Sequence, residues 1–442
     1  MNSVLIAVCI MLALSLARVH VVIALIIATF AGGLLSGLGT LGTLNNFNSG
    51  LGAGATVALS YAFLGAFAVA ISRSGIPDLL AGQVLKKLNK KQGENPALAR
   101  NIRYGVMAAL LVMAVCSQNL IPIHIAFIPL LVPPLLLVTQ KLKLDRRAIA
   151  CVLTFGLITP YMFLPVGFGS IYLNDILLVN LQESGADVSG VSVIRAMALP
   201  ALGMLAGLLV AVFISYRKPR EYSDKKLKRA EHTEVKYSGR SLAVSGVAVI
   251  TAFVVQLMFD SMVLGALVGF VIFSISGVIR WKQADDVFVE GMKMMANVGF
   301  IMITASGFAA VMRATGDIQS LVDTSAALID NSKALGALMM LLVGLVITLG
   351  VGSSFSTVPI IAAIFVPLAL QLGFSPLAIV TLVGTAGALG DAGSPASDST
   401  LGPTAGLNAD GQHNHIWDTV VPTFLHYNLP LLAGGWVAAM LL

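Results

Sequence analysis

Long apolar runs separated by short polar segments dominate this sequence. A helix that crosses a lipid bilayer needs about 20 consecutive, mainly apolar residues. The runs that approach or reach that length lie at 3–17, 19–38, 56–74, 148–167, 195–215, 241–259, 261–280, 297–312, 376–400 and 417–441. The pattern therefore predicts an all-α polytopic membrane protein with about ten transmembrane helices.

Two further apolar regions, 104–139 and 334–373, are too long for one span and are interrupted near the middle by polar residues. The interrupting residues carry hydroxyl or amide groups: Ser117, Gln118 and Asn119 in the first region, and Ser353, Ser354, Ser356 and Thr357 in the second. We predict two re-entrant helical hairpins with these polar clusters at their tips. The alternative is that each region forms two short transmembrane helices joined by a polar turn.

The distribution of basic residues predicts which ends of the helices face the cytoplasm. Segments 86–103, 141–147 and 217–240 are rich in Lys and Arg, whereas segments 168–194 and 314–332 contain acidic residues and no basic ones. We expect the first three segments to be cytoplasmic and the last two to face outward. The first hairpin would then enter from the cytoplasm and the second from outside.

The two halves of the chain match weakly but in the same order. Glycine, proline and short apolar motifs recur in both halves, including the pairs Pro129 with Pro367 and Pro165 with Pro395. We predict a first repeat at 1–216, a basic cytoplasmic linker at 217–240 and a second repeat at 241–442. Five spans in each half would invert the second repeat, as in many secondary transporters whose site lies between the repeats.

Composition supports a membrane protein and excludes several other classes. Hydrophobic residues make up 57% of the chain and charged residues 11%, whereas soluble proteins have roughly 25% charged residues. The net charge of +6 comes from short loops and indicates topology rather than nucleic-acid binding. The three cysteines all lie in apolar runs, so we expect neither disulfides nor a thiolate metal site. No ATP-binding P-loop motif occurs in the sequence.

The stretch 387–404 is the strongest candidate for a functional site. It carries two carboxylates, hydroxyl groups and a proline within a predicted membrane segment: Asp391, Ser394, Pro395, Ser397, Asp398, Ser399 and Thr400. Ionisable groups at this depth are costly and usually mark a path for an ion or a substrate. We predict that Asp391 and Asp398 bind Na⁺, or H⁺ in competition with it. The alternative is structural: Asp391 ends one helix and Asp398 begins the next.

A second broken helix is predicted in the first half, where Thr159 and Pro165 lie in a proline- and glycine-containing stretch. Broken helices expose N–H groups at one end and C=O groups at the other, which suit an anion and Na⁺ respectively. We expect the two breaks and the two hairpin tips to converge. The tips have an alternative interpretation as ordinary turns. Segment 411–418, with His413 and His415, is interpreted as a loop with an interfacial tryptophan.

The run from Gly390 to Thr400 resembles the G-D-x-x-S-P-x-S-D-[ST]-T signature of the NhaC-type sodium/proton antiporter family of the ion transporter superfamily. The resemblance implies an elevator-like movement, a homodimer, and cation handling by Asp391 and Asp398. One departure is Ala392-Gly393, where that family is expected to have a bulkier residue. From these small residues we predict a roomier cavity, as in a related subgroup that is suspected of carrying amino acids.

The leading hypothesis is a secondary active transporter that exchanges Na⁺ and H⁺. The alternative is Na⁺- or H⁺-coupled transport of a small amino acid such as histidine or arginine. An intramembrane aspartyl protease is disfavoured because the sequence contains no Tyr-Asp pair, so no enzymatic activity is expected. We expect no cofactor beyond the coupling ions, no nucleic-acid partner, contact with membrane lipid, and a location in the bacterial cytoplasmic membrane.

Overall fold

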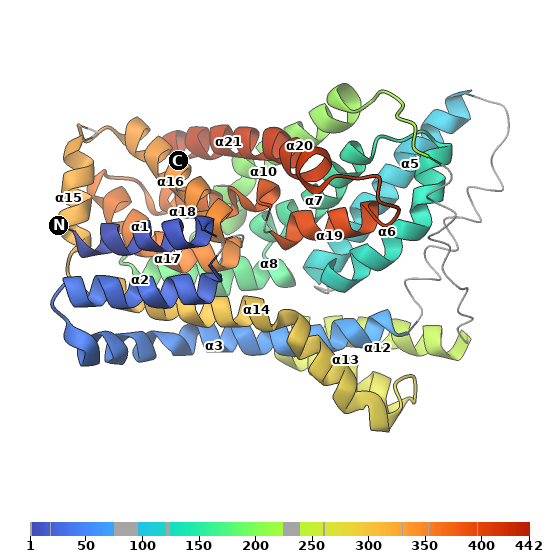
Figure 1. Cartoon of the computed structure of the whole chain (residues 1–442), viewed down its shortest axis with the longest axis horizontal. Helices are drawn as coiled ribbons and strands as arrows, with labels where there is room; N and C mark the ends of the chain where they lie inside the picture. Colours follow the sequence, from blue (N-terminus) through green and yellow to red (C-terminus); the bar gives the residue numbers. More distant parts are fainter. Residues whose placement is uncertain are drawn as a thin grey trace.

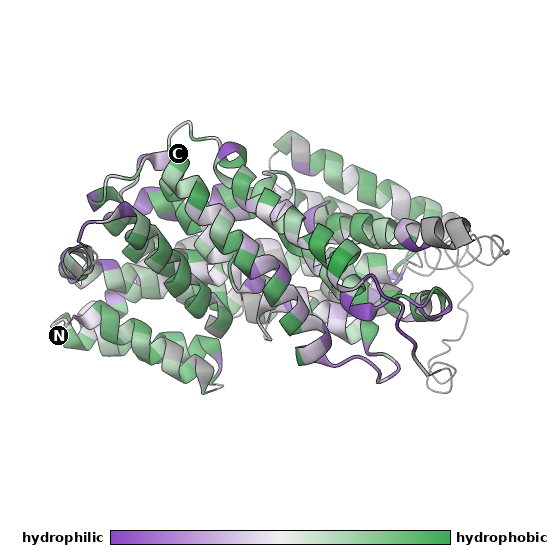
Figure 2. Ribbon diagram, turned by 90° about the horizontal axis from the view of Figure 1, so that it is seen from above, coloured by the Kyte–Doolittle hydropathy of each residue, from purple (hydrophilic) through white to green (hydrophobic). Residues whose placement is uncertain are grey.

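The computed structural model describes residues 2–17, 19–74, 96–120, 124–223, 239–259, 261–328, 330–351, 353–395 and 397–442. These residues form helices and no strand, and apolar residues extend along most of the helices (Figure 2). Among them, five helical stretches are long and apolar enough to cross a membrane, or six if a bent pair counts as one span. The predicted all-α polytopic architecture is confirmed, whereas the number of ten transmembrane helices stays a prediction.

The first half of the chain contains nine α-helices in the described residues. They are α1 (Ser3–Leu16), α2 (Val21–Leu35), α3 (Gly39–Ser72), α5 (Pro96–Val115), α6 (His124–Lys141), α7 (Arg146–Phe163), α8 (Phe168–Ser170), α9 (Val179–Glu183) and α10 (Val193–Val210). Three π-helical segments extend them, at Cys116–Leu120, Ile171–Leu178 and Ala211–Ser215.

The second half follows a similar order. Its α-helices are α12 (Gly239–Phe259), α13 (Met262–Ile275), α14 (Trp281–Ala314), α15 (Ile318–Leu328), α16 (Lys333–Val351), α17 (Ser354–Gln371), α18 (Pro376–Ala388), α19 (Asp398–Leu407), α20 (Val421–Thr423) and α21 (Leu429–Leu441). A 3₁₀ turn at Asp391–Gly393 and π-helical segments at His415–Val420 and Phe424–Asn428 complete this half.

Corresponding helices in the two halves have similar lengths. Helices α3 and α14 both contain 34 residues, and α6 and α17 both contain 18. The repeat, its inversion and the proposed boundaries at 216 and 241 stay predictions. Part of the predicted linker, 224–238, lies outside the described residues, as does most of the basic segment 86–103.

The predicted spans 56–74 and 297–312 each lie in a longer helix, α3 and α14, whose apolar parts are Gly54–Ile71 and Gly299–Ala314. The polar ends of these helices are helical because the backbone hydrogen bonds are made inside the helix, whatever the side chains. The segments 168–194 and 314–332 contain α8 to α9 and α15 respectively. Their outward orientation stays a prediction.

Helices α1, α2, α3, α12, α13 and α14 form one group, with α3 and α14 packed along each other (Figure 1). Glycine makes this approach close: a Cβ atom placed on Gly65 would lie 2.3 Å from the carbonyl oxygen of Gly291. On Gly54, a Cβ would lie 2.6 Å from the Cα of Ile303. Small residues of this kind let helices approach within a membrane. We call these six helices the α3–α14 group.

Helices α5 to α10 and α16 to α21 pack together as a second group, which we call the hairpin group, and α15 packs on α17 at its edge. Helices α5 and α6 lie at one end of the molecule and α16 and α17 at the opposite end (Figure 1). Two helices are broken as predicted. The axis bends by 56° between Arg146–Phe163 and Phe168–Glu183, and residues 389–397 separate α18 from α19. The entry of the hairpins from opposite sides of a membrane stays a prediction.

Candidate functional site

Asp391 lies at the start of the break between α18 and α19. Helix α18 ends at Ala388, and Gly390 then adopts a φ angle of 88°, a left-handed conformation that glycine tolerates best. The N–H group of Gly390 donates a hydrogen bond to Oδ1 of Asn428, with an N–O distance of 2.8 Å. This turn directs the chain so that the Asp391 carboxylate is buried, with 6% of the residue exposed.

Three hydroxyl groups donate hydrogen bonds to the Asp391 carboxylate. Tyr161, in α7, donates to Oδ2 at 2.5 Å, and Ser354, at the first turn of α17, donates to the same oxygen at 2.6 Å. Ser397, on the other side of the break, donates to Oδ1. The site therefore joins the first broken helix, the second hairpin and the second break around one carboxylate. All of these ligand atoms are oxygens, the kind that hard cations prefer.

The first hairpin tip contacts the first break in the same way. The side chain of Asn119 accepts a hydrogen bond from the N–H of Gly169 at 3.1 Å and donates one to the carbonyl of Val166 at 2.9 Å. Each hairpin tip thus touches a helix break, as the sequence led us to expect. Only the second pair carries an acidic residue.

Aromatic rings form one side of the site. The centroids of the Tyr161 and Tyr172 rings are 5.1 Å apart, and those of Phe168 and Phe355 are 4.7 Å apart. Tyr161 also lies 5.3 Å from Phe355, so the rings from both halves of the chain form one cluster. These rings enclose one side of the buried carboxylate, and charge interactions are stronger in such a low-dielectric environment.

Asp391 and Asp398 occupy different environments. Asp398 is the first residue of α19, and its side chain is exposed, whereas Asp391 is buried. The helix is capped by Ser397, which accepts a hydrogen bond from the N–H of Ser399 at 3.1 Å. A carboxylate at a helix N-terminus is favoured by the helix dipole. The predicted structural role of Asp398 at a helix start is therefore present in the structure, alongside any role in ion binding.

The other predicted residues of the second break hold its backbone in place. Thr400 donates hydrogen bonds to the carbonyls of Ser394, at 2.6 Å, and Ser397, at 2.9 Å. Ser394 donates to the carbonyl of Leu349 in α16, at 3.3 Å. The carbonyl of Ser399 accepts a bond from Thr154. These residues shape the site instead of facing Asp391.

Two of the predicted hairpin residues bond within their own helices. Ser117 donates to the carbonyl of Ala114, and Thr357 donates to that of Ser353. Ser356 contacts the sulfur of Met302 in α14 at 3.9 Å. Oε1 of Gln118 and Oγ1 of Thr159 are buried, and neither atom has a hydrogen-bond partner among the described residues. Pro165 is half-buried in the first break.

The prediction of a roomier cavity at Ala392-Gly393 was wrong. A Cβ atom placed on Gly393 would lie 2.7 Å from the Cα of Phe424 and 2.8 Å from Nδ2 of Asn428. Ala392 is fully buried. The residues at these positions are small because the segment Phe424–Asn428 packs directly against the break, and the space is filled by protein.

Segment 411–418, interpreted as a loop with an interfacial tryptophan, is non-helical up to Asn414 and begins a π-helical segment at His415, and Trp417 is exposed. His415 bonds through Nε2 to the carbonyl of Pro395 at 2.9 Å and through Nδ1 to the hydroxyl of Thr404 at 2.8 Å. Thr404 donates to Thr419, which bonds to Nε2 of His413 at 2.7 Å. Because this chain reaches Pro395, the segment supports the second break. Burial lowers the pKa of His413 to about 4, so this side chain is neutral at pH 7.

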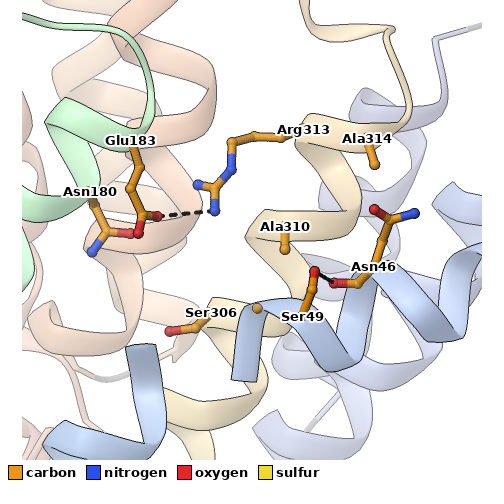
Figure 3. Close-up of a pocket in the computed structure, with 9 residues that line it drawn as sticks. Asn46, Ser49, Asn180, Glu183, Ser306, Ala310, Arg313 and Ala314 are labelled. Carbon is orange, nitrogen blue, oxygen red and sulfur yellow. Dashed lines mark hydrogen bonds and ion pairs between the residues drawn. The ribbon is translucent and has the colours of Figure 1, made fainter. Parts of the chain in front are cut away.

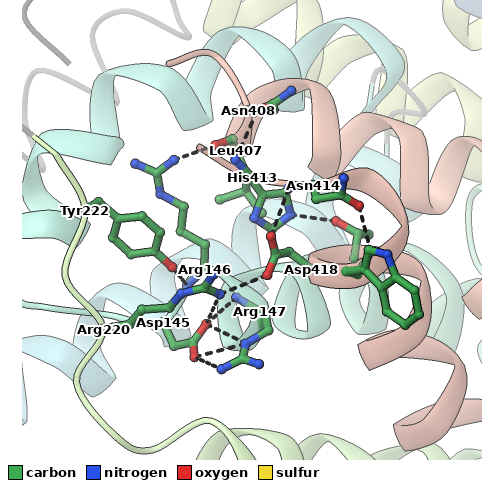
Figure 4. Close-up of polar contacts among 12 residues, drawn as sticks. Asp145, Arg146, Arg147, Arg220, Tyr222, Leu407, Asn408, His413, Asn414 and Asp418 are labelled. Carbon is green, nitrogen blue, oxygen red and sulfur yellow. Dashed lines mark hydrogen bonds and ion pairs between the residues drawn. The ribbon is translucent and has the colours of Figure 1, made fainter. Parts of the chain in front are cut away.

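Charged residues surround this histidine at one end of α7 (Figure 4). Arg146 forms two hydrogen bonds with Asp410, each 2.7 Å long, and both side chains are fully buried. Burial of Asp410 acts to raise its pKa, but the hydrogen bonds and charge of Arg146 outweigh it and lower the pKa below the ordinary value. Arg220, from the predicted linker, donates to Asp418 at 2.9 Å. The first residues of the linker therefore contact the segment that follows α19, while most of residues 217–223 remain exposed.

Two protein-family models match this chain. A family model described as "Na+/H+ antiporter family" matches residues 152–436, and a second, described as "Na+-H+ antiporter family", matches residues 2–88. This protein belongs to the Na⁺/H⁺ antiporter family. The membership confirms the resemblance inferred from the Gly390–Thr400 motif, and it identifies a membrane transporter and not an enzyme.

This antiporter-family member has several full-length relatives. It is 58% identical to an uncharacterized membrane protein of Vibrio parahaemolyticus, over 100% of both chains. It is 51% identical to an uncharacterized membrane protein of Haemophilus influenzae, over 100% of this chain and 99% of that one. It is 49% identical to YuiF of Bacillus subtilis, named as a putative amino acid transporter, over 100% of both chains.

Two solved transporters share the fold. The YdaH transporter of Alcanivorax borkumensis superposes with a TM-score of 0.55 at 16% identity, covering 89% of this chain and 85% of that one. MtrF of Neisseria gonorrhoeae, described as an antimetabolite efflux pump, superposes with a TM-score of 0.54 at 16% identity, covering 90% and 83%. At this identity the likeness establishes the fold alone.

Proposed function

We propose that this multi-pass membrane transporter exchanges Na⁺ and H⁺, and that Asp391 binds the two ions in alternation. The observation that carries the proposal is the buried carboxylate of Asp391, which receives hydrogen bonds from Tyr161, Ser354 and Ser397. A protonated carboxyl needs no further countercharge. A deprotonated carboxylate with hydroxyl oxygens around it offers Na⁺ an all-oxygen shell.

Competition for one site would couple the two fluxes. If Na⁺ and H⁺ cannot bind Asp391 together, each crossing of the hairpin group carries one or the other. We further propose an elevator-like movement, in which the hairpin group carries the site past the α3–α14 group. In support, Tyr161, Ser354, Asp391 and Ser397 all belong to the hairpin group or its breaks. Asp398, exposed at the start of α19, is assigned to ion entry and not to the buried site.

Proteoliposomes test this function. An imposed Na⁺ gradient should change the internal pH in the wild type, and Asp391→Asn should abolish the change because an amide neither titrates nor carries charge. Asp398→Asn should slow it and leave it measurable. Asp187→Asn is the matched control, since Asp187 is exposed in the connection after α9. Na⁺-driven proton movement that persists in Asp391→Asn would refute the proposal.

Cation-coupled transport of an amino acid is the second candidate. The observation that favours it is the name of the Bacillus subtilis relative, a putative amino acid transporter, at 49% identity over the whole chain. The same vesicles decide between the candidates when they are given labelled histidine or arginine. Uptake that needs a Na⁺ or H⁺ gradient, with no ion exchange in its absence, would establish the second candidate. Ion exchange without any amino acid would establish the first.

The expected location and assembly belong to the same proposal. The three full-length relatives come from bacteria, which supports a cytoplasmic-membrane transporter. The apolar outer faces of the α3–α14 group, such as Ile250 at 65% exposure and Ile275 at 76%, would contact lipid or a second copy in a homodimer. Cross-linking in native membranes tests the homodimer, with a band of twice the monomer mass as the expected result.

A further inference from the structure

A cavity of about 630 Å³ lies between the α3–α14 group and the hairpin group, and Asp391 is not among the residues that line it (Figure 3). Its polar lining comes from three helices: Asn46 and Ser49 of α3, Asn180 and Glu183 of α9, and Ser306 and Arg313 of α14. Small-molecule sites commonly have volumes of about 300–1,000 Å³ and a few converging polar groups. This cavity has both properties, and the Asp391 site does not account for it.

The cavity carries one positive and one negative charge. Arg313 donates through Nη2 to Oε2 of Glu183 at 3.1 Å, and the two side chains are 29% and 42% exposed. The second terminal nitrogen of Arg313, Nη1, is buried and has no hydrogen-bond partner among the described residues. An unsatisfied guanidinium N–H is unfavourable, and it leaves half of the fork that binds a carboxylate unused.

The neutral polar residues around this ion pair use their donor groups in their own helices. Asn46 and Asn180 each donate to a backbone carbonyl in their own helix through Nδ2, and Ser49 donates to the carbonyl of Asn46. These three residues line the cavity together with Ser306. The lining therefore offers one guanidinium donor, one carboxylate acceptor and several neutral oxygens that suit an ammonium group.

We propose that this cavity binds a zwitterionic amino acid. The α-carboxylate pairs with Nη1 and Nη2 of Arg313, and the α-ammonium pairs with the Glu183 carboxylate that the ligand displaces. Such an exchange preserves both charges of the ion pair and supplies the acceptor that Nη1 lacks. A simple anion or cation would leave one member of the pair without a countercharge, which is costly in a partly buried site.

A ligand bound at this site would replace a contact between the two groups of helices. Glu183 ends α9 in the hairpin group, whereas Arg313 lies in the last turn of α14 in the other group, so the ion pair joins the two groups. Glu183 lies in the segment 168–194 and Arg313 directly precedes the segment 314–332, both of which are predicted to face outward. The ligand would thus enter from outside and replace a direct contact between the groups. Binding of the ligand does not depend on the proposed function, whereas its transport after binding does.

Binding is therefore measured apart from transport. Purified protein in lipid nanodiscs, in Na⁺-free buffer, is titrated with L-alanine, L-histidine and L-arginine by calorimetry. We expect saturable binding of at least one of them. Arg313→Gln and Glu183→Gln should each weaken it at least 10-fold, and the methyl ester of the same amino acid should bind at least 10-fold more weakly than the free acid.

Matched variants and a folding check keep the test decisive. Arg195→Gln and Asp187→Asn remove exposed charges and should leave binding unchanged. Arg313→Lys keeps the positive charge but lacks the paired N–H groups of the guanidinium. It should lose part of the affinity for the amino acid. Its size-exclusion profile should match that of the wild type. No saturable binding to any of the three amino acids, or equal binding of acid and ester, would overturn the inference. Loss of Na⁺/H⁺ exchange in Asp391→Asn with intact amino-acid binding would leave it standing.

Discussion

A single buried carboxylate connects distant parts of this chain. Asp391 receives hydrogen bonds from Tyr161, 230 positions away, and from Ser354, 37 positions away. The hydroxyl oxygens of Tyr161 and Ser354 also lie 2.5 Å apart. Hydrogen bonds to a charged group each contribute roughly 1.5–3 kcal/mol. The protonation state of one residue therefore affects how both halves of the molecule pack around the site.

Tyr161→Phe should weaken the apparent affinity for Na⁺ at least about 10-fold, because it removes one oxygen from Asp391 at a cost of about 1.5–3 kcal/mol. The measurement is the Na⁺ concentration dependence of proton movement in proteoliposomes. Tyr172→Phe is the control, since its hydroxyl donates to the carbonyl of Gly384 and not to the carboxylate. Equal effects of the two substitutions would contradict this role for Tyr161.

His413 should make the stability of the protein depend on pH. Its pKa falls from the ordinary 6.5 to about 4 on folding because burial disfavours the charged form. The unfolded chain therefore binds more protons than the folded one within this window. Stability is full above about pH 6.5 and is lost as the pH falls toward 4, by up to about 3 kcal/mol.

His413→Gln keeps a polar partner for Thr419 but cannot titrate. We expect the thermal unfolding midpoint of the wild type to fall between pH 7.5 and pH 5, and that of the variant to fall less. His20→Gln, at an exposed residue before α2, should behave like the wild type. Identical pH profiles for His413→Gln and the wild type would show that another group controls acid stability.

At the scale of helices, close packing of α3 on α14 depends on glycines that face each other. A Cβ on Gly291 would lie 2.2 Å from the backbone nitrogen of Ala66, and backbone atoms cannot move aside without separating the helices. The same physical demand explains Gly393 at the second break. In both places the sequence requires the absence of a side chain so that one backbone can approach another.

Gly291→Ala should lower stability by roughly 1–3 kcal/mol, because overpacking outweighs the helix propensity of alanine. Gly246→Ala is the matched control in α12, where no atom lies within 4 Å of the added methyl group. There, propensity alone should raise stability by up to about 1 kcal/mol. Thermal unfolding in detergent measures both effects. A Gly291→Ala midpoint at or above that of the wild type would show that the helices can separate at little cost.

At the scale of the whole molecule, the two groups meet where α17 packs on α14. Ser356 of α17 lies against Met302 of α14, with 3.9 Å between oxygen and sulfur. If transport requires the hairpin group to move past the α3–α14 group, a covalent link across this boundary must stop it. A link within one group has no such effect.

Met302→Cys with Ser356→Cys, in a background without Cys9, Cys116 and Cys151, should lose transport when mercuric ion bridges the thiols. Activity should return after addition of excess thiol. Ser375→Cys with Leu442→Cys is the control within the hairpin group, where Oγ of Ser375 lies 2.9 Å from the Leu442 carbonyl. Transport that continues after cross-linking of 302 to 356 would contradict the elevator-like movement.

The sequence alone predicted the helical membrane fold and the two long apolar regions that are interrupted by polar residues. It also predicted both helix breaks and the presence of Asp391 in the second break. These follow from local properties, since apolar length, proline, glycine and acidic residues act on their own segment. It did not reveal Tyr161, which lies in an apolar run like many buried tyrosines. Nor did it reveal the chain of bonds from His413 to Pro395, because these depend on residues that only folding brings together.

Local chemistry therefore determined that this chain spans a membrane and places a carboxylate in a broken helix. Tertiary structure decided which carboxylate is enclosed: Asp391 is surrounded by hydroxyls from three segments, whereas Asp398 is exposed at a helix start. It also decided that Gly393 packs directly against Phe424. In the same way it decided that Glu183 and Arg313 form an ion pair beside a cavity. The physical reason is that burial and hydrogen-bond partners depend on distances between segments, which no local pattern of residues specifies.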